Sequence, residues 1–350
     1  MKCILIEKHG EDIDKLLTLA QDHPKPIRKK GEVLIQVQAC ALAPGDIRVL
    51  KGHCDYFQAP RSFPYIPGGD ISGIVQEADE NSRFHKGDAC LAMFESPRPL
   101  DGLAEYACVK ESLVEWRPAS ISPAAAACLT SSALFAFRAV QHVKTGSRVL
   151  ILGGSGGVGT FLIQLARNAG ASYIATTSTD EQLCHFLGAD YVINYKKKNF
   201  WDIPAFQKDP FDLIFDLGVG RYDAWKQAKD SKILKNGWNS GKYITANGDE
   251  PEMIIHNLWQ TLRFVSGVFG RVAWTALWRW DPSYIVLSSG LEVTPGIFQD
   301  LTQLVEEKKL QVVFHPSKMP FKLDLESVKR GFHIMNERAG HGKVVIHISK

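Results

Sequence analysis

The sequence predicts an α/β protein that combines a doubly wound parallel sheet with a second, β-rich part. Up to about residue 120, short apolar runs such as residues 32–38 and 71–75 are separated by glycine and proline, which indicates antiparallel strands. From Pro123 the pattern becomes an alanine-rich helical stretch through Ala139, and strands then alternate with helices at the spacing of βαβ units. This change of pattern indicates two domains.

The elements of the second part follow from apolar runs and from helical periodicity. We expect strand 148–152, helix 158–168, strand 173–176, helix 181–187, strand 213–216 and strand 242–245. After Pro295 we expect a helix over 298–308, a strand over 311–314, a helix from Leu325 and a terminal strand over 343–348. The alternation is typical of a sheet with helices on both faces.

Composition and charge restrict the classes of function. The chain has 350 residues, of which 45% are hydrophobic, so it can bury a core without disulfide bonds. Its 41 Lys and Arg against 38 Asp and Glu give a net charge of +3, too small to make nucleic-acid binding the expected function. No two of the seven cysteines are spaced as CxxC, so neither a disulfide framework nor a zinc ribbon is indicated. Because the N-terminal residues run directly into a strand pattern, we expect a cytoplasmic protein.

Residues 258–280 are rich in Trp, Phe and Val and need separate consideration. Arg263, Arg271 and Arg279 interrupt this segment, so no apolar window of roughly 18 residues remains to span a membrane. We expect buried or interface helices packed by aromatic side chains, with contact to a membrane surface as the alternative.

A glycine-rich loop follows the expected strand 148–152 directly and runs into a helix. Its residues are Gly153, Gly154, Ser155, Gly156, Gly157, Val158 and Gly159, with the pattern GxGxxG at 154, 156 and 159. Glycines let backbone N–H groups approach a pyrophosphate, and the N-terminus of the following helix carries a partial positive charge toward it. The position of the loop between a strand and a helix therefore predicts dinucleotide binding rather than a plain tight turn.

The end of the next strand bears on the choice of cofactor. An NAD site places an acidic residue there for the ribose hydroxyls, but this chain has Thr177 and Ser178. The acids that follow are explained by a helix capping box that begins at Ser178 and ends at Glu181. Small hydroxyl side chains leave room for a 2′-phosphate, and Tyr195 with the lysines at 196–198 could supply a hydroxyl and positive charge. We therefore expect NADPH, with the last two of these lysines in solvent.

Several short motifs resemble those of one enzyme superfamily. They are Pro44–Asp46, Pro64–Gly73, Lys86–Asp88, Gly102–Tyr106, Leu129-Thr130, the glycine loop, Leu187–Asp190 and Gly342–Ile346. With these motifs the chain resembles the medium-chain dehydrogenase/reductase superfamily in its zinc-free quinone oxidoreductase branch, and within it the reticulon-interacting reductases. The resemblance implies a GroES-like catalytic domain formed by residues 1–122 and 295–350, and a Rossmann NADPH-binding domain formed by residues 123–294. It also implies an active site between the two domains.

The resemblance allows the zinc ligands to be compared one by one. Zinc alcohol dehydrogenases have a Cys where this chain has Ala43, and a Gly-His-Glu motif where it has Gly68-Gly69-Asp70. Neither alanine nor glycine offers a side-chain lone pair, so we expect no catalytic zinc. Zinc-free relatives commonly have Asn before the motif Asp and Tyr two residues after it, where this chain has Ala43-Pro44 and Arg48. The resemblance therefore leaves the substrate open.

Four residues are the candidates for catalysis. Arg48 would bind an oxyanion if it faces the cleft, or else lies at the surface. Asp46 is expected to bond neighbouring backbone or Arg48. Tyr56 would donate a proton from a loop or only cover the cleft, and Thr130 would lie near the nicotinamide or begin a helix. The expected cofactor site comprises Thr130, Ser155, Gly156, Gly157, Val158, Gly159, Thr177, Ser178, Tyr195 and Lys343.

These features predict a zinc-independent, NADPH-dependent reductase that transfers hydride to a quinone or an α,β-unsaturated carbonyl. The alternative enzyme is an enoyl-thioester or alkenal double-bond reductase, in which Arg48 and Lys51 would face a phosphate or carboxylate. Another alternative is a weakly catalytic NADPH-binding protein that senses redox state or binds partners through its aromatic segment. Binding of single-stranded RNA rests only on the lysines at 196–198. We expect a homodimer with a small-molecule substrate, no nucleic-acid partner and no transmembrane segment.

Overall fold

The chain forms two compact units, each with its own sheet and hydrophobic core. The computed structural model describes residues 1–53, 62–94, 101–218, 223–246, 254–287, 296–338 and 340–349. The first unit comprises Met1–Leu134 and Gly290–Lys350, and the second comprises Phe135–Ser289.

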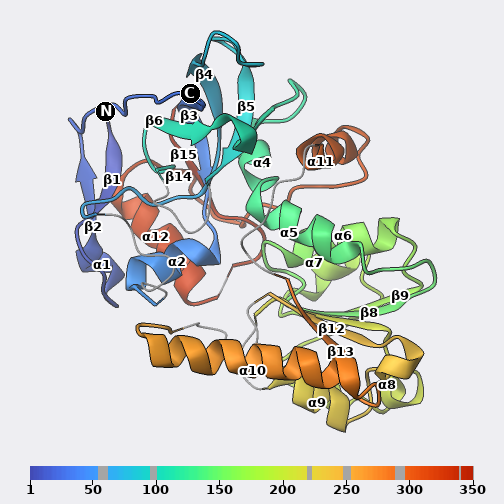
Figure 1. Ribbon diagram of the computed structural model, residues 1–350. Helices are drawn as coiled ribbons and strands as arrows, with labels where there is room; N and C mark the ends of the chain where they lie inside the picture. The colour runs from blue at the N-terminus through green and yellow to red at the C-terminus, as the bar shows by residue number, and fades with distance from the viewer. Residues whose placement is uncertain are drawn as a thin grey trace. The chain divides into compact units, whose positions relative to one another are not determined.

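The first unit is mostly β structure, as the sequence predicts (Figure 1). Its strands are β1 (Cys3–Ile6), β2 (Leu17–Ala20), β3 (Glu32–Ala41), β4 (Asp70–Glu77), β5 (Ala89–Met93), β6 (Tyr106–Lys110), β7 (Val114–Trp116), β14 (Phe321–Lys322) and β15 (Val345–His347). Its helices are α1 (Ile13–Leu16), α2 (Pro44–Lys51), the 3-10 turn η1 (Glu111–Leu113), α4 (Pro123–Cys128), α11 (Ile297–Glu306) and α12 (Leu325–Asn336).

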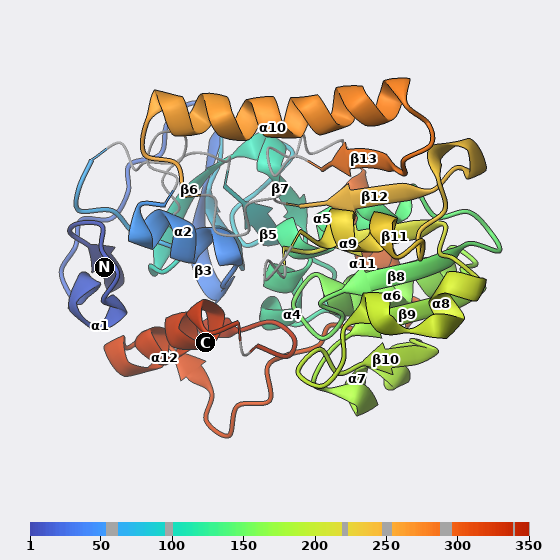
Figure 2. The ribbon, with the colours of Figure 1, turned by 90° about the horizontal axis from the view of Figure 1, so that it is seen from below.

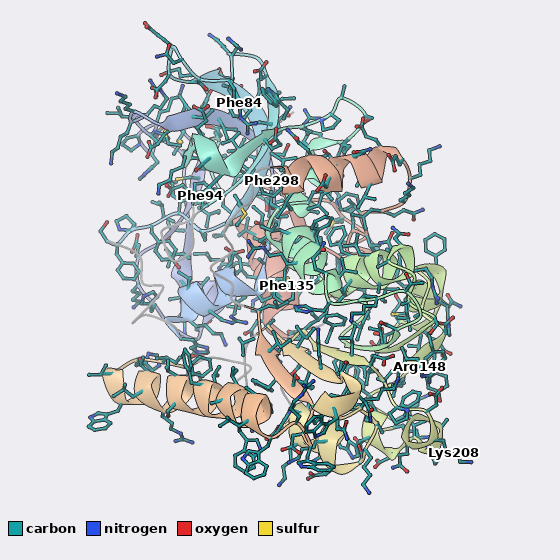
Figure 3. The ribbon with its side chains drawn as sticks, turned by 45° about the vertical axis from the view of Figure 1, so that its right-hand side comes forward. Phe84, Phe94, Phe135, Arg148, Lys208 and Phe298 are labelled. Carbon is teal, nitrogen blue, oxygen red and sulfur yellow. The ribbon has the colours of Figure 1, made fainter. Side chains whose placement is uncertain are left out.

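Strand β3 is the centre of this unit. It pairs antiparallel with β4, β6 and β15, and the sheet runs in the order β14-β15-β3-β4-β5-β7. Apolar side chains of β3 such as Val33, Ile35 and Val37 are fully buried in a core that also contains Phe84 (Figure 3). Because β15 comes from the C-terminal segment, both ends of the chain are needed to complete the sheet.

Two local predictions for the first unit are wrong. Residues 311–314 form no strand, since Phe314 makes only an isolated bridge to Lys343. The expected single helix from 123 to 139 is α4 followed by α5 (Ser131–Val140). The chain breaks between them because the Ser131 N–H donates to Asp70 Oδ1 at 3.2 Å instead of to the Ala127 carbonyl, which accepts from the Thr130 hydroxyl at 2.8 Å. Helix α4 packs against β3 and β4, and the compact unit includes it.

The second unit is built on a six-stranded parallel sheet. Its elements are α5, β8 (Arg148–Leu152), α6 (Gly159–Asn168), β9 (Tyr173–Thr177), α7 (Glu181–Phe186), β10 (Tyr191–Ile193), η2 (Phe200–Asp202), α8 (Pro204–Lys208), β11 (Leu213–Asp216), α9 (Ala224–Asp230), η3 (Gly237–Asn239), β12 (Lys242–Thr245), α10 (Leu258–Leu277) and β13 (Ser283–Val286). The strand order is β10-β9-β8-β11-β12-β13, with α6 and α7 on one face and α9 and α10 on the other (Figures 1 and 2). This order is that of a dinucleotide-binding Rossmann sheet and confirms the predicted doubly wound fold.

Side chains pack together at the N-terminal ends of the strands of this sheet. Arg148, labelled in Figure 3, stacks over the ring of Tyr173 at 4.3 Å and pairs with Asp209 at 3.0 Å. Tyr173 in turn stacks on Phe211, with 6.3 Å between ring centres. The opposite, carboxyl edge carries the glycine loop, which is where open α/β sheets bind ligands.

The aromatic segment forms one helix rather than several. Helix α10 lies beside β13 and buries only Thr261 and Thr275 fully, while Trp259 and Leu277 are 81% and 80% exposed. The expectation of a buried helix is therefore wrong for most of its large side chains, and the alternative of an interface helix stays a prediction. In the part of the chain that the structure describes, no helix is both long enough and apolar enough to cross a membrane.

Candidate functional site

The glycine loop joins the carboxyl end of β8 to the N-terminus of α6 and is fastened to β9. The backbone N–H of Gly153 donates to Thr177 Oγ1 at 2.9 Å, and that of Gly154 donates to the Thr177 carbonyl at 3.1 Å. At the far end of the loop, the N–H of Thr160 donates to the Gly156 carbonyl at 3.0 Å, which starts α6. The buried Thr177 therefore supports the loop from behind.

Of the three glycines in the GxGxxG pattern, packing requires Gly154 and Gly159 but not Gly156. A Cβ on Gly154 would lie 2.1 Å from Thr176 Oγ1, and a Cβ on Gly159 would lie 2.2 Å from the Gly153 carbonyl. A Cβ on Gly156 would meet only the Gly153 carbonyl, at 3.3 Å, and Gly156 is partly exposed like the two residues after it. The chain itself leaves space in front of Gly156, as the close approach of a pyrophosphate requires.

Behind the loop, two buried serines form a neutral hydrogen bond. Ser178 Oγ donates to Ser155 Oγ at 2.8 Å and accepts from the Asp180 N–H at 2.9 Å. The predicted capping box is wrong, because α7 is capped by Asp180, whose carboxylate accepts from the Leu183 N–H at 3.0 Å. The first acid after β9 is thus engaged in its own helix, and the end of β9 presents hydroxyls.

Tyr195 and the three lysines form a turn after β10, the strand next to β9. Tyr195 is half-buried, whereas the lysines are exposed. The N–H of Lys196 donates to Asn194 Oδ1 at 3.1 Å, which fixes the start of the turn. Positive charge therefore follows β10 at the carboxyl edge of the sheet, the edge that carries the glycine loop.

In the first unit, Asp46 is almost completely buried at the start of α2. Its Oδ2 accepts from the Ala43 N–H at 2.8 Å, so the expected bond to neighbouring backbone is present. Burial, with a smaller contribution from the negative charge of Asp70, raises the pKa of Asp46 to about 7.

Asp70 and Lys343 form a buried ion pair, with 3.6 Å between Oδ2 and Nζ. Asp70 also accepts from Ser131, from its N–H at 3.2 Å and from its hydroxyl at 2.5 Å. Lys343 Nζ donates to the Leu42 carbonyl at 3.0 Å and to Ser132 Oγ at 2.9 Å. We call Asp46, Asp70, Ser131, Ser132 and Lys343 the Asp–Lys cluster.

Sequence reasoning missed this cluster. Lys343 was assigned to the cofactor through resemblance alone, and that role stays a prediction. One signal was present: Asp70 begins a buried apolar strand, and a buried carboxylate needs a cation or several donors. Which cation pairs with it could not be read from the sequence, because Asp70 and Lys343 come from opposite ends of the chain.

The structure describes the positions of most, but not all, of the other candidate residues. Arg48 lies half-buried on α2, and Thr130 is fully buried before α5. Tyr56 falls outside the described residues. Lys51, which the enoyl-thioester alternative would use, pairs with the exposed Glu11 at 2.8 Å. The structure thus brings Asp46, Arg48 and Thr130 into one unit and the glycine loop into the other.

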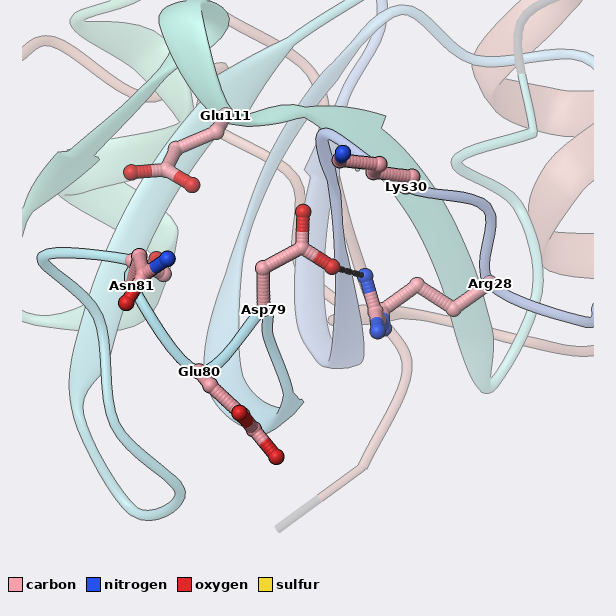
Figure 4. A pocket seen from close by; sticks show the side chains of 7 residues that line it. Arg28, Lys30, Asp79, Glu80, Asn81 and Glu111 are labelled. Carbon is pink, nitrogen blue, oxygen red and sulfur yellow. Dashed lines mark hydrogen bonds and ion pairs between the residues drawn. The ribbon is translucent and has the colours of Figure 1, made fainter.

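A polar hollow of about 460 Å³ lies on the first unit, away from these residues in sequence. It is lined by Arg28, Lys30, Asp79, Glu80, Asn81, Ser82 and Glu111, and an Arg28–Asp79 ion pair crosses its floor (Figure 4). Among the described residues, no group of three or more His, Cys, Asp or Glu side chains could hold a metal ion.

Two family models match the chain. Residues 29–118 match the alcohol dehydrogenase GroES-like domain, and residues 187–346 match the zinc-binding dehydrogenase domain. The chain is 30% identical to 2-methylene-furan-3-one reductase of Solanum lycopersicum, over 95% of this chain and 76% of that protein. It is 36% identical to the chloroplastic quinone-oxidoreductase homolog of Spinacia oleracea, over 99% and 98%. It is 31% identical to mitochondrial NAD(P)H oxidoreductase RTN4IP1 of Bos taurus, over 99% and 89%.

Solved structures of quinone oxidoreductases have the same fold as this chain. The quinone oxidoreductase from Coxiella burnetii superposes with a TM-score of 0.79 at 25% identity, over 99% of both chains. The Escherichia coli quinone oxidoreductase complexed with NADPH shares the fold with a TM-score of 0.76 at 18% identity, over 99% of this chain and 100% of that chain. The predicted GroES-like and Rossmann folds are confirmed. The chain belongs to the medium-chain dehydrogenase/reductase superfamily, with quinone oxidoreductases among its relatives.

Proposed function

We propose that this protein is a zinc-independent, NADPH-dependent reductase that transfers hydride to a quinone or an α,β-unsaturated carbonyl. The observation that carries the proposal is the glycine loop at the carboxyl end of β8, with hydroxyls instead of an acid at the end of β9. Relatives named for quinones and for a methylene-furanone support the substrate class.

The residues of the second unit fit a dinucleotide. The pyrophosphate would lie in front of Gly156 at the N-terminus of α6, where no side chain of the loop intervenes. Ser178 carries no charge and would tolerate a 2′-phosphate, while Tyr195 and Lys196 would bind it. When bound, NADPH supplies a hydride from its nicotinamide ring.

The proposal of zinc independence rests on the donor set. Ala43 stands where zinc alcohol dehydrogenases have a Cys ligand, and Gly69 where they have a His ligand. Asp46 and Asp70 lie near these positions in sequence, but each is engaged by backbone or side-chain donors of its own unit. The matched dehydrogenase model carries zinc in its name, while these two positions offer no metal-binding side chain.

Reduction of a conjugated carbonyl or a quinone places negative charge on an oxygen atom, which then takes up a proton. Arg48 is our candidate for stabilising this oxygen, because it is a half-buried cation on α2. Asp46 would act by holding the start of α2 through the Ala43 N–H, and so would position Arg48 rather than react itself. We also propose, from the sequence, that the protein is a cytoplasmic homodimer.

The test measures initial rates of NADPH consumption with an ortho-quinone and with an alkenal, each repeated with NADH. We expect oxidation that prefers NADPH, with one acceptor class clearly faster. Two matched variants, Lys196→Gln and Lys198→Gln, locate the 2′-phosphate site. Lys196→Gln should lower kcat/KM about tenfold for NADPH and leave NADH unchanged, as expected for one charge-assisted hydrogen bond. Lys198→Gln should change neither.

Failure of NADPH to bind would overturn the proposal. Tight NADPH binding without reduction of any acceptor would favour the redox-sensing alternative. Stoichiometric zinc that is retained on purification, and whose removal abolishes turnover, would overturn zinc independence.

A further inference from the structure

Helix α10 presents large apolar side chains to solvent. At about 100° per residue, Trp259, Leu262, Phe269 and Leu277 fall within about 80° of one another around the helix axis. The fully buried Thr261 and Thr275 lie on the opposite side. The helix therefore uses one face for packing on its own unit and leaves a second, apolar face exposed.

Further exposed tryptophans follow the end of the helix. Trp278 and Trp280 follow α10 directly, and Trp238 lies beside Trp280 with 6.4 Å between ring centres. Arg279 lies over the Trp238 ring at 5.2 Å. We call Trp259, Leu262, Phe269, Leu277, Trp278 and Trp280 the α10 surface.

The segment that carries the α10 surface contains basic but no acidic residues. From residue 254 to residue 280 the sequence contains arginines at 263, 271 and 279 and neither Asp nor Glu. The acids that adjoin the helix are engaged within the same unit: Asp223 pairs with Arg271 at 2.7 Å, and Asp281 accepts from the Trp274 indole at 2.9 Å. Arg263 falls about 40° from Trp259 around the helix, at the border of the apolar face.

We propose that the α10 surface docks on an anionic lipid membrane, with the helix lying in the plane of the headgroups. Exposed tryptophans flanked by arginines suit that interface, because an indole combines an apolar body with an N–H donor and a guanidinium binds phosphate. A second copy fits less well. A two-fold interface places the same surface on both partners, so Arg263 of each copy would meet no acid of the other copy's α10 surface.

The test is flotation of the full chain with vesicles of phosphatidylcholine, with and without phosphatidylserine, at low and high salt. We expect binding that is stronger with phosphatidylserine and weakened by salt. The double variant Trp259→Gln with Leu277→Gln should lower partitioning at least about tenfold, because two exposed apolar side chains are lost from the contact. Arg263→Gln should lower binding to phosphatidylserine vesicles about fivefold.

The matched control is Phe186→Gln on α7, since Phe186 is also largely exposed but lies outside the α10 surface. This variant should float like the wild type. NADPH oxidation by each variant checks that it is folded, and Arg263→Gln keeps the test decisive if the double variant does not fold. No flotation with either vesicle would overturn the proposal, as would equal flotation of wild type and Arg263→Gln. A dimer that dissociates in the double variant, without vesicle binding, would assign the surface to a second copy instead.

Discussion

The glycine loop of the second unit and the Asp–Lys cluster of the first unit are both buried polar networks, but they are built differently. The loop network joins neighbouring strands through neutral groups, such as Ser178 to Ser155 and Gly153 to Thr177. The Asp–Lys cluster joins β4, α5 and the C-terminal segment through charges that are almost fully buried. Neutral hydroxyls tolerate imperfect pairing, whereas a buried charge that loses its partner is costly.

This difference has a consequence for the two regions. Adding atoms should damage the loop at Gly154 and Gly159, because neither has space for a Cβ. Removing a charge should damage the cluster, because two carboxylates share one ammonium group: Asp46 and Asp70 are both within electrostatic reach of Lys343.

The largest effect is expected for Lys343→Met. The substitution removes the cation from the buried Asp70 carboxylate and should lower the free energy of unfolding by about 3–5 kcal/mol, measured by urea denaturation. Lys15→Met is the matched control, since Lys15 pairs with Asp12 in solvent and its loss should change stability far less than the loss of Lys343. Adding Asp70→Asn to Lys343→Met should recover part of the loss. Equal stability of the two lysine variants would contradict a structural role for the buried pair.

A smaller loss of stability is expected in the loop, where substitution of two of its glycines should have different effects. Gly159→Ala would place a Cβ 2.2 Å from the Gly153 carbonyl and should lower the free energy of unfolding by about 1–3 kcal/mol. Gly156→Ala should change it by less than about 0.5 kcal/mol, since its Cβ meets one atom at 3.3 Å. NADPH fluorescence titration should nevertheless show about tenfold weaker binding for Gly156→Ala, because the new methyl group faces the pyrophosphate. Unchanged affinity would place the phosphates elsewhere.

Much of the second unit could be predicted from sequence. Strands β8, β11 and β12 have their expected bounds, because each is a short apolar run in a parallel sheet that is buried on both faces. The glycine loop could also be predicted from the sequence, because all of its residues are adjacent in the chain. Elements that consecutive residues specify can therefore be predicted without knowing which distant residues they contact.

Errors arose where distant residues compete for a local group. Ser178 looks like a helix cap, but Ser155 offers its hydroxyl a buried partner and leaves the cap to Asp180. The helix after Pro123 looks continuous, but the backbone of Ser131 donates to Asp70, a residue from β4. Hydrogen bonds between residues that are far apart in the sequence determine where these helices begin, and a single sequence does not show which residues form them.

Stability should also depend on pH, and this dependence tests the Asp–Lys cluster alone. Burial raises the pKa of Asp46 from 3.8 to about 7, so between these values the folded state holds a proton that the unfolded state has released. The free energy of unfolding should therefore fall as pH rises from about 4 to about 7, by at most about 1.4 kcal/mol per pH unit, and then level off.

Asp46→Asn should remove this contribution, because an amide keeps the acceptor for the Ala43 N–H but does not ionise. The quantity to measure is the difference between wild type and variant in urea denaturation across pH 4 to 8, since Asp101, whose pKa burial raises to about 6, contributes a similar slope to both. Asp12→Asn at the exposed start of α1 is the control and should leave the wild-type slope in this window. If wild type and Asp46→Asn show the same slope, Asp46 is ionised in the folded protein, and Lys343 must then balance two buried carboxylates at neutral pH.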